Sequence, residues 1–227
     1  MKQTMFERLQ SLPLLMGLSV NELMKIVEEI DFAFEKFYDG YTFVNQWDKC
    51  DKILFVLNGE ICAYKRDDAN DMHLHEYFSP KNYLIEPQNL WGMRQKYERT
   101  YSFTNEGNIC AIEKKQFNYL LSNYEIVKTN FLSLICNRLQ YTTDILHQPF
   151  PKNSDDKIKR LFKLHKIAFN GKTFIKIKMN QLADIISDTR LNVSKSLNEW
   201  ESKGLISLKR GLIIINDDEQ FFNNNSK

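Results

Sequence analysis

The stretch that decides the fold is residues 179–217, MNQLADIISDTRLNVSKSLNEWESKGLISLKRGLIIIND. Apolar residues recur at helical spacing over 180–187 and again over 189–203, and Gly204 ends the second segment. The following residues read as two short strands that turn at 209–211. A helix, a short turn, an amphipathic helix and a hairpin in this order are typical of a winged helix-turn-helix.

The second predicted helix has two chemically different faces. Val193, Leu197 and Trp200 form an apolar stripe, and the small side chain of Ala183 lets the first helix cross it closely. Thr189 is the predicted N-cap. The residues expected to face outward are Arg190, Asn192, Ser194, Lys195, Ser196 and Lys203.

These outward residues have the chemistry that recognition of double-stranded DNA requires. Arginine can make two hydrogen bonds to guanine and asparagine two to adenine, whereas lysine and serine commonly hold phosphates. Lys209 and Arg210, at the hairpin tip, are expected to reach adjacent backbone phosphates. The predicted DNA-binding residues are therefore Thr189, Arg190, Asn192, Ser194, Lys195, Ser196, Lys209 and Arg210.

Charge is distributed unevenly along the chain. The net charge of the whole chain is +2, yet residues 152–216 hold 14 basic and 6 acidic residues, and residues 1–151 hold 16 basic and 20 acidic residues. A basic C-terminal part is the electrostatic footprint of a polyanion-binding protein. A solvated basic face is the alternative interpretation of the charge alone.

The N-terminal half follows a different pattern. Residues 4–30 read as helix, with a break at Pro13 and Ser19 as the cap of a second helix. From about 32 to 113, short β-type runs alternate with turn sequences, which predicts a small antiparallel barrel or jelly roll. We call this predicted element the β-roll, and its runs are FAFEKF, YTFV, ILFVL, ICAYK, MHLHEYF, YSFT and NICAIE.

A long helix is predicted over residues 114–147, where apolar residues recur every three or four positions. A helix of this length would extend roughly 50 Å, which is more than a small barrel can cover. We therefore expect a coiled-coil homodimer through this helix, with an entirely intramolecular core as the alternative.

Two prolines, Pro149 and Pro151, end the long helix, and Ser154 is the predicted cap of the helix that follows. The predicted organisation is thus an α+β chain in three parts: a β-roll sensor domain (1–113), a dimerisation helix (114–147) and a winged helix-turn-helix domain (148–227).

Composition excludes several classes of protein. With 227 residues, 43% of them hydrophobic, the chain can bury a real core, which argues against disorder. No apolar run approaches the ~18 residues of a membrane span, and Glu7 and Arg8 stand where a signal peptide would be apolar, so we expect a cytoplasmic protein without a membrane partner. The four cysteines form no close pair, so neither a metal site nor a cofactor is expected.

At residues 179–217 the sequence resembles the C-terminal helix-turn-helix of the Crp/Fnr family of bacterial transcription regulators, whose pattern is A-x-x-(I/L/V)-G-x-(S/T)-R-x-x-V-(S/G)-R-x-L. Arg190 falls on the first base-reading arginine of that pattern, and Lys195 on its second basic contact. Leu191 stands where many members have a base-contacting glutamate, and Ser187 replaces the usual turn glycine, so the family's half-site is not carried over. The resemblance implies a homodimeric, sequence-specific regulator, with RNA polymerase as a further partner.

The resemblance extends to the N-terminal half, which is similar to a cyclic-nucleotide-binding β-roll with Gly40 and Gly59 at its turn glycines. Glu86, Arg99 and Thr100 match residues of the phosphate-binding cassette. The resemblance therefore implies an effector site at these three residues.

Two glycines of that cassette are replaced by Lys81 and Ile85, whose side chains would obstruct the approach of a phosphate to the backbone. An effector other than classical cyclic AMP, in a vestigial or repurposed pocket, is therefore expected. The alternative is that Glu86 and Arg99 form an internal ion pair.

Two other functions stay open. A cupin-like metal-dependent enzyme could use His73, His75 and Glu76 as ligands, since the two histidines share one face of a strand. A scaffold that keeps the fold without binding DNA is also possible. No P-loop, dinucleotide glycine motif or Ser-His-Asp spacing supports another enzyme, so we expect no catalytic residues.

Overall fold

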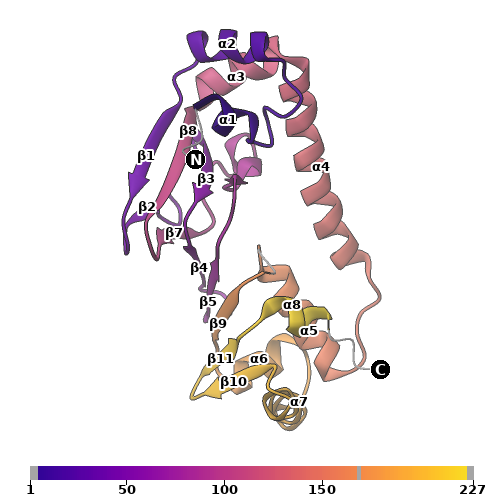
Figure 1. Cartoon of the computed structure of the whole chain (residues 1–227). Helices are drawn as coiled ribbons and strands as arrows, with labels where there is room; N and C mark the ends of the chain where they lie inside the picture. The colour runs from indigo at the N-terminus through magenta and orange to yellow at the C-terminus, as the bar shows by residue number, and fades with distance from the viewer. Residues whose placement is uncertain (1–4, 168–169, 224–227) are drawn as a thin grey trace. The chain divides into compact units, whose positions relative to one another are not determined.

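A computed structural model describes residues 5–167 and 170–223 of the chain (Figure 1). The chain divides into two compact units. The first unit comprises Met1–Glu60, Pro80–Glu98 and Phe103–Tyr141, and the second comprises Ile61–Ser79, Arg99–Ser102 and Thr142–Lys227. The predicted α+β class is confirmed, but the units do not follow the predicted borders because two whole strands of the β-roll and most of a third belong to the second unit.

The first unit begins with helices α1 (Met5–Gln10) and α2 (Val20–Glu29). Residue 4, which the sequence assigned to the first helix, lies outside the described residues. The predicted cap of α2 is confirmed: the backbone N–H of Ser19 donates to the Glu22 carboxylate at 2.8 Å, and the Ser19 hydroxyl oxygen accepts from the Glu22 N–H at 3.3 Å. This reciprocal pair is a capping box, and it fixes where the helix starts.

All the predicted runs of the β-roll are strands. The structure adds the short strand β6, whose two residues are too few to show an alternating pattern in the sequence. In one sheet β1, β8, β3 and β6 are neighbours in that order, and their pairing is antiparallel. The strands are β1 (Ala33–Phe37), β2 (Thr42–Val44), β3 (Lys52–Asn58), β4 (Ile61–Asp67), β5 (Met72–Phe78), β6 (Tyr83–Leu84), β7 (Thr100–Phe103) and β8 (Gly107–Glu113).

Gly59 shows why the β-roll needs glycine at one of its predicted turns. Its φ is +103°, and a Cβ at this position would lie 2.8 Å from the Cα of Gly107. A side chain here would meet backbone, so the turn after β3 requires glycine.

The prediction of one continuous helix over 114–147 is wrong. The segment forms α3 (Lys114–Asn123) and α4 (Glu125–His147), whose directions differ (Figure 1). Tyr124, between them, has extended backbone, and the side chain of Asn123 donates to the carbonyl oxygen of Tyr119 at 2.8 Å. The Tyr124 N–H still donates to the carbonyl oxygen of Leu120 at 3.0 Å, but the extended backbone of Tyr124 ends α3, although the apolar pattern continues into α4.

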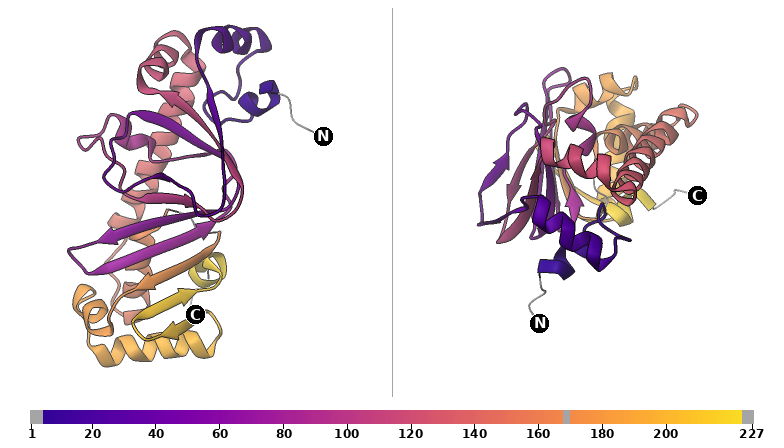
Figure 2. Two further views of the ribbon diagram at one scale, coloured as in Figure 1. Left: turned by 90° about the vertical axis from the view of Figure 1, so that its left-hand side faces the viewer. Right: turned by 90° about the horizontal axis from the view of Figure 1, so that it is seen from above.

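The second unit contains the predicted helix-turn-helix and joins it to strands β4 and β5. Its strands lie in a sheet of the order β10-β11-β9-β5-β4-β7-β2, and Figure 2 shows the strands from β10 to β4 lying in succession. In the β5–β9 pair, His73 lies opposite Lys176 and Glu76 opposite Thr173. The further elements are α5 (Ser154–His165), β9 (Lys172–Lys176), α6 (Met179–Ile185), α7 (Arg190–Ser202), β10 (Ile206–Lys209), β11 (Leu212–Ile215) and α8 (Asp218–Asn223).

The predicted cap of α5 is off by one residue. Asn153 caps the helix, because its side-chain oxygen accepts from the Asp156 N–H at 2.8 Å. The hydroxyl of Ser154 instead donates to Asp188 at 2.8 Å. Asparagine and serine are comparable caps, so the local sequence cannot rank the two positions.

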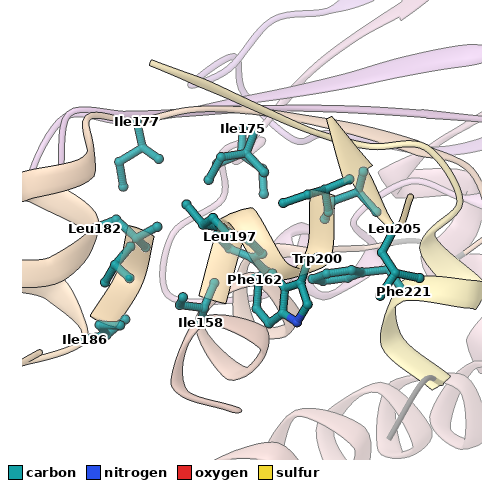
Figure 3. Close-up of a cluster of buried hydrophobic side chains, with 14 of the residues drawn as sticks. Ile158, Phe162, Ile175, Ile177, Leu182, Ile186, Leu197, Trp200, Leu205 and Phe221 are labelled. Atoms are coloured by element: carbon teal, nitrogen blue, oxygen red, sulfur yellow. The ribbon is translucent and has the colours of Figure 1, made fainter. Parts of the chain in front are cut away.

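The helix-turn-helix surrounds a continuous apolar core (Figure 3). Trp200 of α7 is 2% exposed and packs edge-on against Phe221 of α8, with ring centroids 5.0 Å apart. Phe162 of α5 and Leu182 of α6 are also buried in this core. Because four helices and the hairpin share one core, the orientation of α7 is fixed by packing.

Candidate nucleic-acid interface

The turn between α6 and α7 is held by the backbone of one unusual residue. Ser187 has a φ of +51°, a left-handed conformation that favours glycine. The N–H of Asp188 then donates to the carbonyl oxygen of Ala183 at 3.0 Å. The structure thus explains why the family pattern has a glycine at this point.

Asp188 ties this turn to two neighbouring helices. Its carboxylate accepts from the Asn192 side chain at 2.8 Å and from the Ser154 hydroxyl at 2.8 Å, and it lies 3.4 Å from the Lys157 ammonium. Hydrogen bonds from Asn192, Ser154 and the Thr189 N–H hold the pKa of Asp188 below its usual range. Asp188 is not among the residues predicted from the sequence, although an aspartate directly before a predicted N-cap indicates such a role.

The predicted N-cap is confirmed, since the Thr189 hydroxyl accepts from the Asn192 N–H at 3.2 Å. One side-chain donor of Asn192 is therefore committed to Asp188 at the start of α7. This bond orients the amide, and it leaves Asn192 with fewer side-chain hydrogen-bond donors for a base edge.

Most of the predicted outward residues of α7 do face solvent. Arg190, Asn192 and Lys195 are exposed, and Ser194 is half-buried. Ser196 is different: it is 5% exposed, so the prediction that it faces outward is wrong. It follows Val193 by three positions and precedes Trp200 by four, which places it on the buried face.

The two ends of α7 differ in charge. Lys203, which follows the last helical residue, pairs with Glu199 at 2.6 Å, and this ion pair lowers the pKa of Glu199. Arg190 and Lys195 lie in the first half of the helix, and no acidic residue precedes Glu199 in α7. Positive charge is therefore concentrated where a recognition helix meets base edges.

The hairpin of β10 and β11 is the predicted wing. Gly211 has a φ of +70° at its tip, and Lys209 and Arg210 are exposed beside it. The side chain of Glu201 on α7 accepts from the Leu208 N–H of β10 at 2.7 Å. This bond connects the hairpin to α7 and holds the two basic surfaces next to each other.

Arg99, a predicted effector residue, is part of a buried ion cluster in the second unit. Its guanidinium lies 3.1 Å from Glu76 of β5 and also donates to the carbonyl oxygen of His165 at the end of α5. Glu76 is 1% and Arg99 5% exposed. Arg99 thus pairs with Glu76, and not with Glu86 as one reading of the sequence had it.

The cluster continues to α8. The Lys166 ammonium lies 3.5 Å from Glu76 and 2.9 Å from Asp218, and the Thr173 hydroxyl donates to Asp218 at 2.9 Å. Burial raises the pKa of Asp218, and Lys166 acts in the opposite direction. The charges of the two cations and the two carboxylates balance. We call this group the buried ion cluster, and its contacts link strand β5 to the helix-turn-helix.

The other two predicted effector residues have separate surroundings. Glu86 is buried with a φ of +34°, and its carboxylate accepts from the Asn89 side chain at 2.7 Å and the Glu98 N–H at 2.6 Å. Thr100 is the half-buried first residue of β7. The carboxylate of Glu86 is thus used to hold its own loop.

The ligand set of the cupin alternative does not come together. His73 and His75 lie on one face of β5, as predicted: the Tyr64 hydroxyl is 2.8 Å from His73 Nδ1, and its ring centroid is 4.5 Å from that of His75. Glu76 is on the opposite, buried face, in the ion cluster. Among residues 5–167 and 170–223, no group of three or more histidine, cysteine or acidic side chains is arranged to hold a metal ion.

Comparison with known proteins agrees with the site. Residues 158–221 match the model of the Crp-like helix-turn-helix domain. A protein described as a transcriptional regulator of the Crp/Fnr family from Eubacterium rectale is 16% identical, with a TM-score of 0.51, 92% of this chain covered and 95% of that one. The catabolite activator protein of Thermus thermophilus is 15% identical, with a TM-score of 0.49 and coverages of 92% and 96%. No curated protein sequence matches.

In the part of the chain that the structure describes, no helix is both long and apolar enough to cross a membrane. The domain match covers α7, the wing and the core that holds them, and the shared fold covers the β-roll as well. Residues 158–221 are therefore a Crp-like helix-turn-helix domain, and the chain as a whole has the fold of the Crp/Fnr transcription regulators.

Proposed function

We propose that this protein is a homodimeric, sequence-specific DNA-binding regulator of transcription and not an enzyme. The observation that carries the proposal is α7, whose apolar face is buried while Arg190 and Lys195 are exposed beside the basic wing. An exposed basic helix on a rigid core is what major-groove recognition requires. The match to the Crp-like helix-turn-helix domain supports the same function.

The proposal predicts a base-reading role for Arg190. Replacing Arg190 with alanine is expected to weaken binding to the preferred DNA by about 1–3 kcal/mol and to relax the preference at one base pair, because a bidentate contact to guanine is lost. The matched control is Lys209→Ala on the wing, which should weaken binding about equally on all sequences. Electrophoretic mobility titrations on a set of single-base variants measure both effects.

Equal losses on every sequence for Arg190→Ala would contradict base reading by this residue. Loss of the fold is excluded beforehand by thermal unfolding, since Arg190 is exposed and its removal should leave stability within about 0.5 kcal/mol.

The proposed dimer uses an apolar face of α4. Val127 and Phe131 are buried within the first unit, whereas Leu132 is 52% and Leu139 65% exposed. These two leucines are seven residues apart, with the exposed Cys136 between them at the coiled-coil spacing of four and three. A second copy of α4 would bury this face, and two helix-turn-helix domains would then address half-sites one DNA turn apart.

Changing Leu139 to lysine is therefore expected to dissociate the dimer. Burying a leucine contributes at least about 1.5 kcal/mol, and two copies contribute about 3 kcal/mol, which is more than a hundredfold in the dissociation constant. Sedimentation equilibrium measures the change, and Asn137→Lys, outside the face, is the control. A wild-type chain that remains monomeric at high micromolar concentration would contradict the proposed dimer.

We further propose that the β-roll binds a small-molecule effector without a resident cofactor, and that the DNA-bound dimer contacts RNA polymerase in the cytoplasm. Classical cyclic AMP is disfavoured because Arg99 is held by Glu76 and the His165 carbonyl. Binding measurements on the purified chain, with cyclic nucleotides and with other small anions, test this part separately.

A further inference from the structure

Leu191 of α7 is an exposed apolar residue, and neither a phosphate contact nor packing in the core explains an apolar side chain at this position. Leu191 is 79% exposed, although it stands in the first turn of the recognition helix between two polar residues. It precedes Lys195 by four positions and Asn198 by seven, so these three residues share one face. Val193, Leu197 and Trp200 form the buried face on the other side.

Leu191 therefore points away from the domain core, in the first turn of the helix that would meet DNA. The first turn of a recognition helix is the part that reaches base edges in the major groove. Arginine and lysine on either side supply the attraction to the phosphates and to guanine. An apolar side chain among them can gain free energy only from an apolar group on the DNA.

The major groove presents one such group, the C5-methyl of thymine. We propose that Leu191 is a specificity-determining residue that packs against a thymine methyl group in each half-site. This inference rests on the proposed DNA-binding function and extends it to one base. The neighbouring Asn192 supports the inference, because its side-chain amide donates to Asp188. The amide is therefore less available to contact the base next to Leu191.

The experiment first selects preferred duplexes from a random DNA pool with the full-length wild-type chain, and repeats the selection with Leu191→Ala and Leu191→Glu. The wild type should select thymine at a position that becomes unspecified with Leu191→Ala. With Leu191→Glu the same position should shift to cytosine, because a carboxylate accepts a hydrogen bond from the cytosine amino group.

The second step removes only the methyl group, by placing deoxyuridine at that thymine in the selected duplex. The wild-type chain should lose about fourfold in affinity per half-site, the value of one buried methyl group, and Leu191→Ala should lose almost nothing. Leu164→Ala, an exposed leucine of α5, should behave as the wild type. Thermal unfolding confirms that each variant is folded.

The outcomes are distinct. Equal sensitivity of the wild type and Leu191→Ala to methyl removal overturns the inference while leaving DNA binding intact. Selection of a half-site that lacks thymine, or whose thymine preference survives Leu191→Ala, overturns it as well. If the wild-type chain selects no sequence at all, the proposed function itself fails, and the inference falls with it.

Discussion

Truncating Trp200 to alanine is expected to lower the free energy of unfolding by about 3–5 kcal/mol. The indole is almost completely buried in the helix-turn-helix core, against Phe221, and residues of four helices make up this core (Figure 3). The neighbouring elements cannot close on the space that the ring leaves. The variant therefore loses the free energy of burying the ring and also retains an unfavourable cavity. Chemical denaturation followed by circular dichroism measures the change.

Asn198→Ala is the matched control for Trp200→Ala, because it lies on the exposed face of the same helix and should change stability by less than about 0.5 kcal/mol. Trp200→Ala should also abolish specific DNA binding at temperatures where the domain has unfolded. Loss of stability no larger than that of the control would mean that α7 does not pack on this core.

Replacing Arg99 by methionine is expected to cost about 3 kcal/mol in the free energy of unfolding. Breaking a buried ion pair typically costs about 3–5 kcal/mol because the remaining charge stays buried. We expect the lower end of this range, because the Lys166 ammonium remains 3.5 Å from Glu76 and still pairs with its charge. Methionine preserves most of the side-chain volume, so the effect reports the charge and its hydrogen bonds.

The matched control is Arg66→Met on the neighbouring strand β4, where the arginine is 59% exposed and pairs with Asp68 at the surface. That pair is worth at most about 1 kcal/mol. The double variant Glu76→Leu/Arg99→Met removes both buried charges and should recover part of the loss, leaving Lys166 with Asp218. If Arg99→Met is no more destabilising than Arg66→Met, the buried ion cluster does not hold the second unit together.

The helix-turn-helix and the β-roll could be predicted because their local patterns agree with their environments. The switch from helical spacing to alternation at Gly204 marks the wing, and Thr189 caps the helix that the sequence assigned to it. The prediction for Ser196 is wrong because serine occurs on both the exposed and the buried faces of helices. Only its spacing from Val193 and Trp200 along the sequence places it on the buried face. Such a residue is decided by packing and not by its own chemistry.

Non-local pairing accounts for most of the remaining differences. Nothing near Glu76 in the sequence indicates that β5 pairs with β9, about a hundred residues later, or that Lys166 and Asp218 meet there. The break between α3 and α4 lies at the extended backbone of Tyr124, which the helical periodicity of the apolar residues does not reveal. Charge-bearing side chains that are buried in pairs look like surface residues until their partners are known.

The most direct measurement of the central claim is the affinity of the full-length chain for its selected duplex and for a scrambled duplex of equal length, each over a series of salt concentrations. We predict that the selected duplex binds at least about a thousandfold more tightly, and that both affinities fall steeply with salt as lysine and arginine displace counterions. Equal affinity for the two duplexes, or binding that salt does not weaken, would contradict the account that α7 and the wing read DNA.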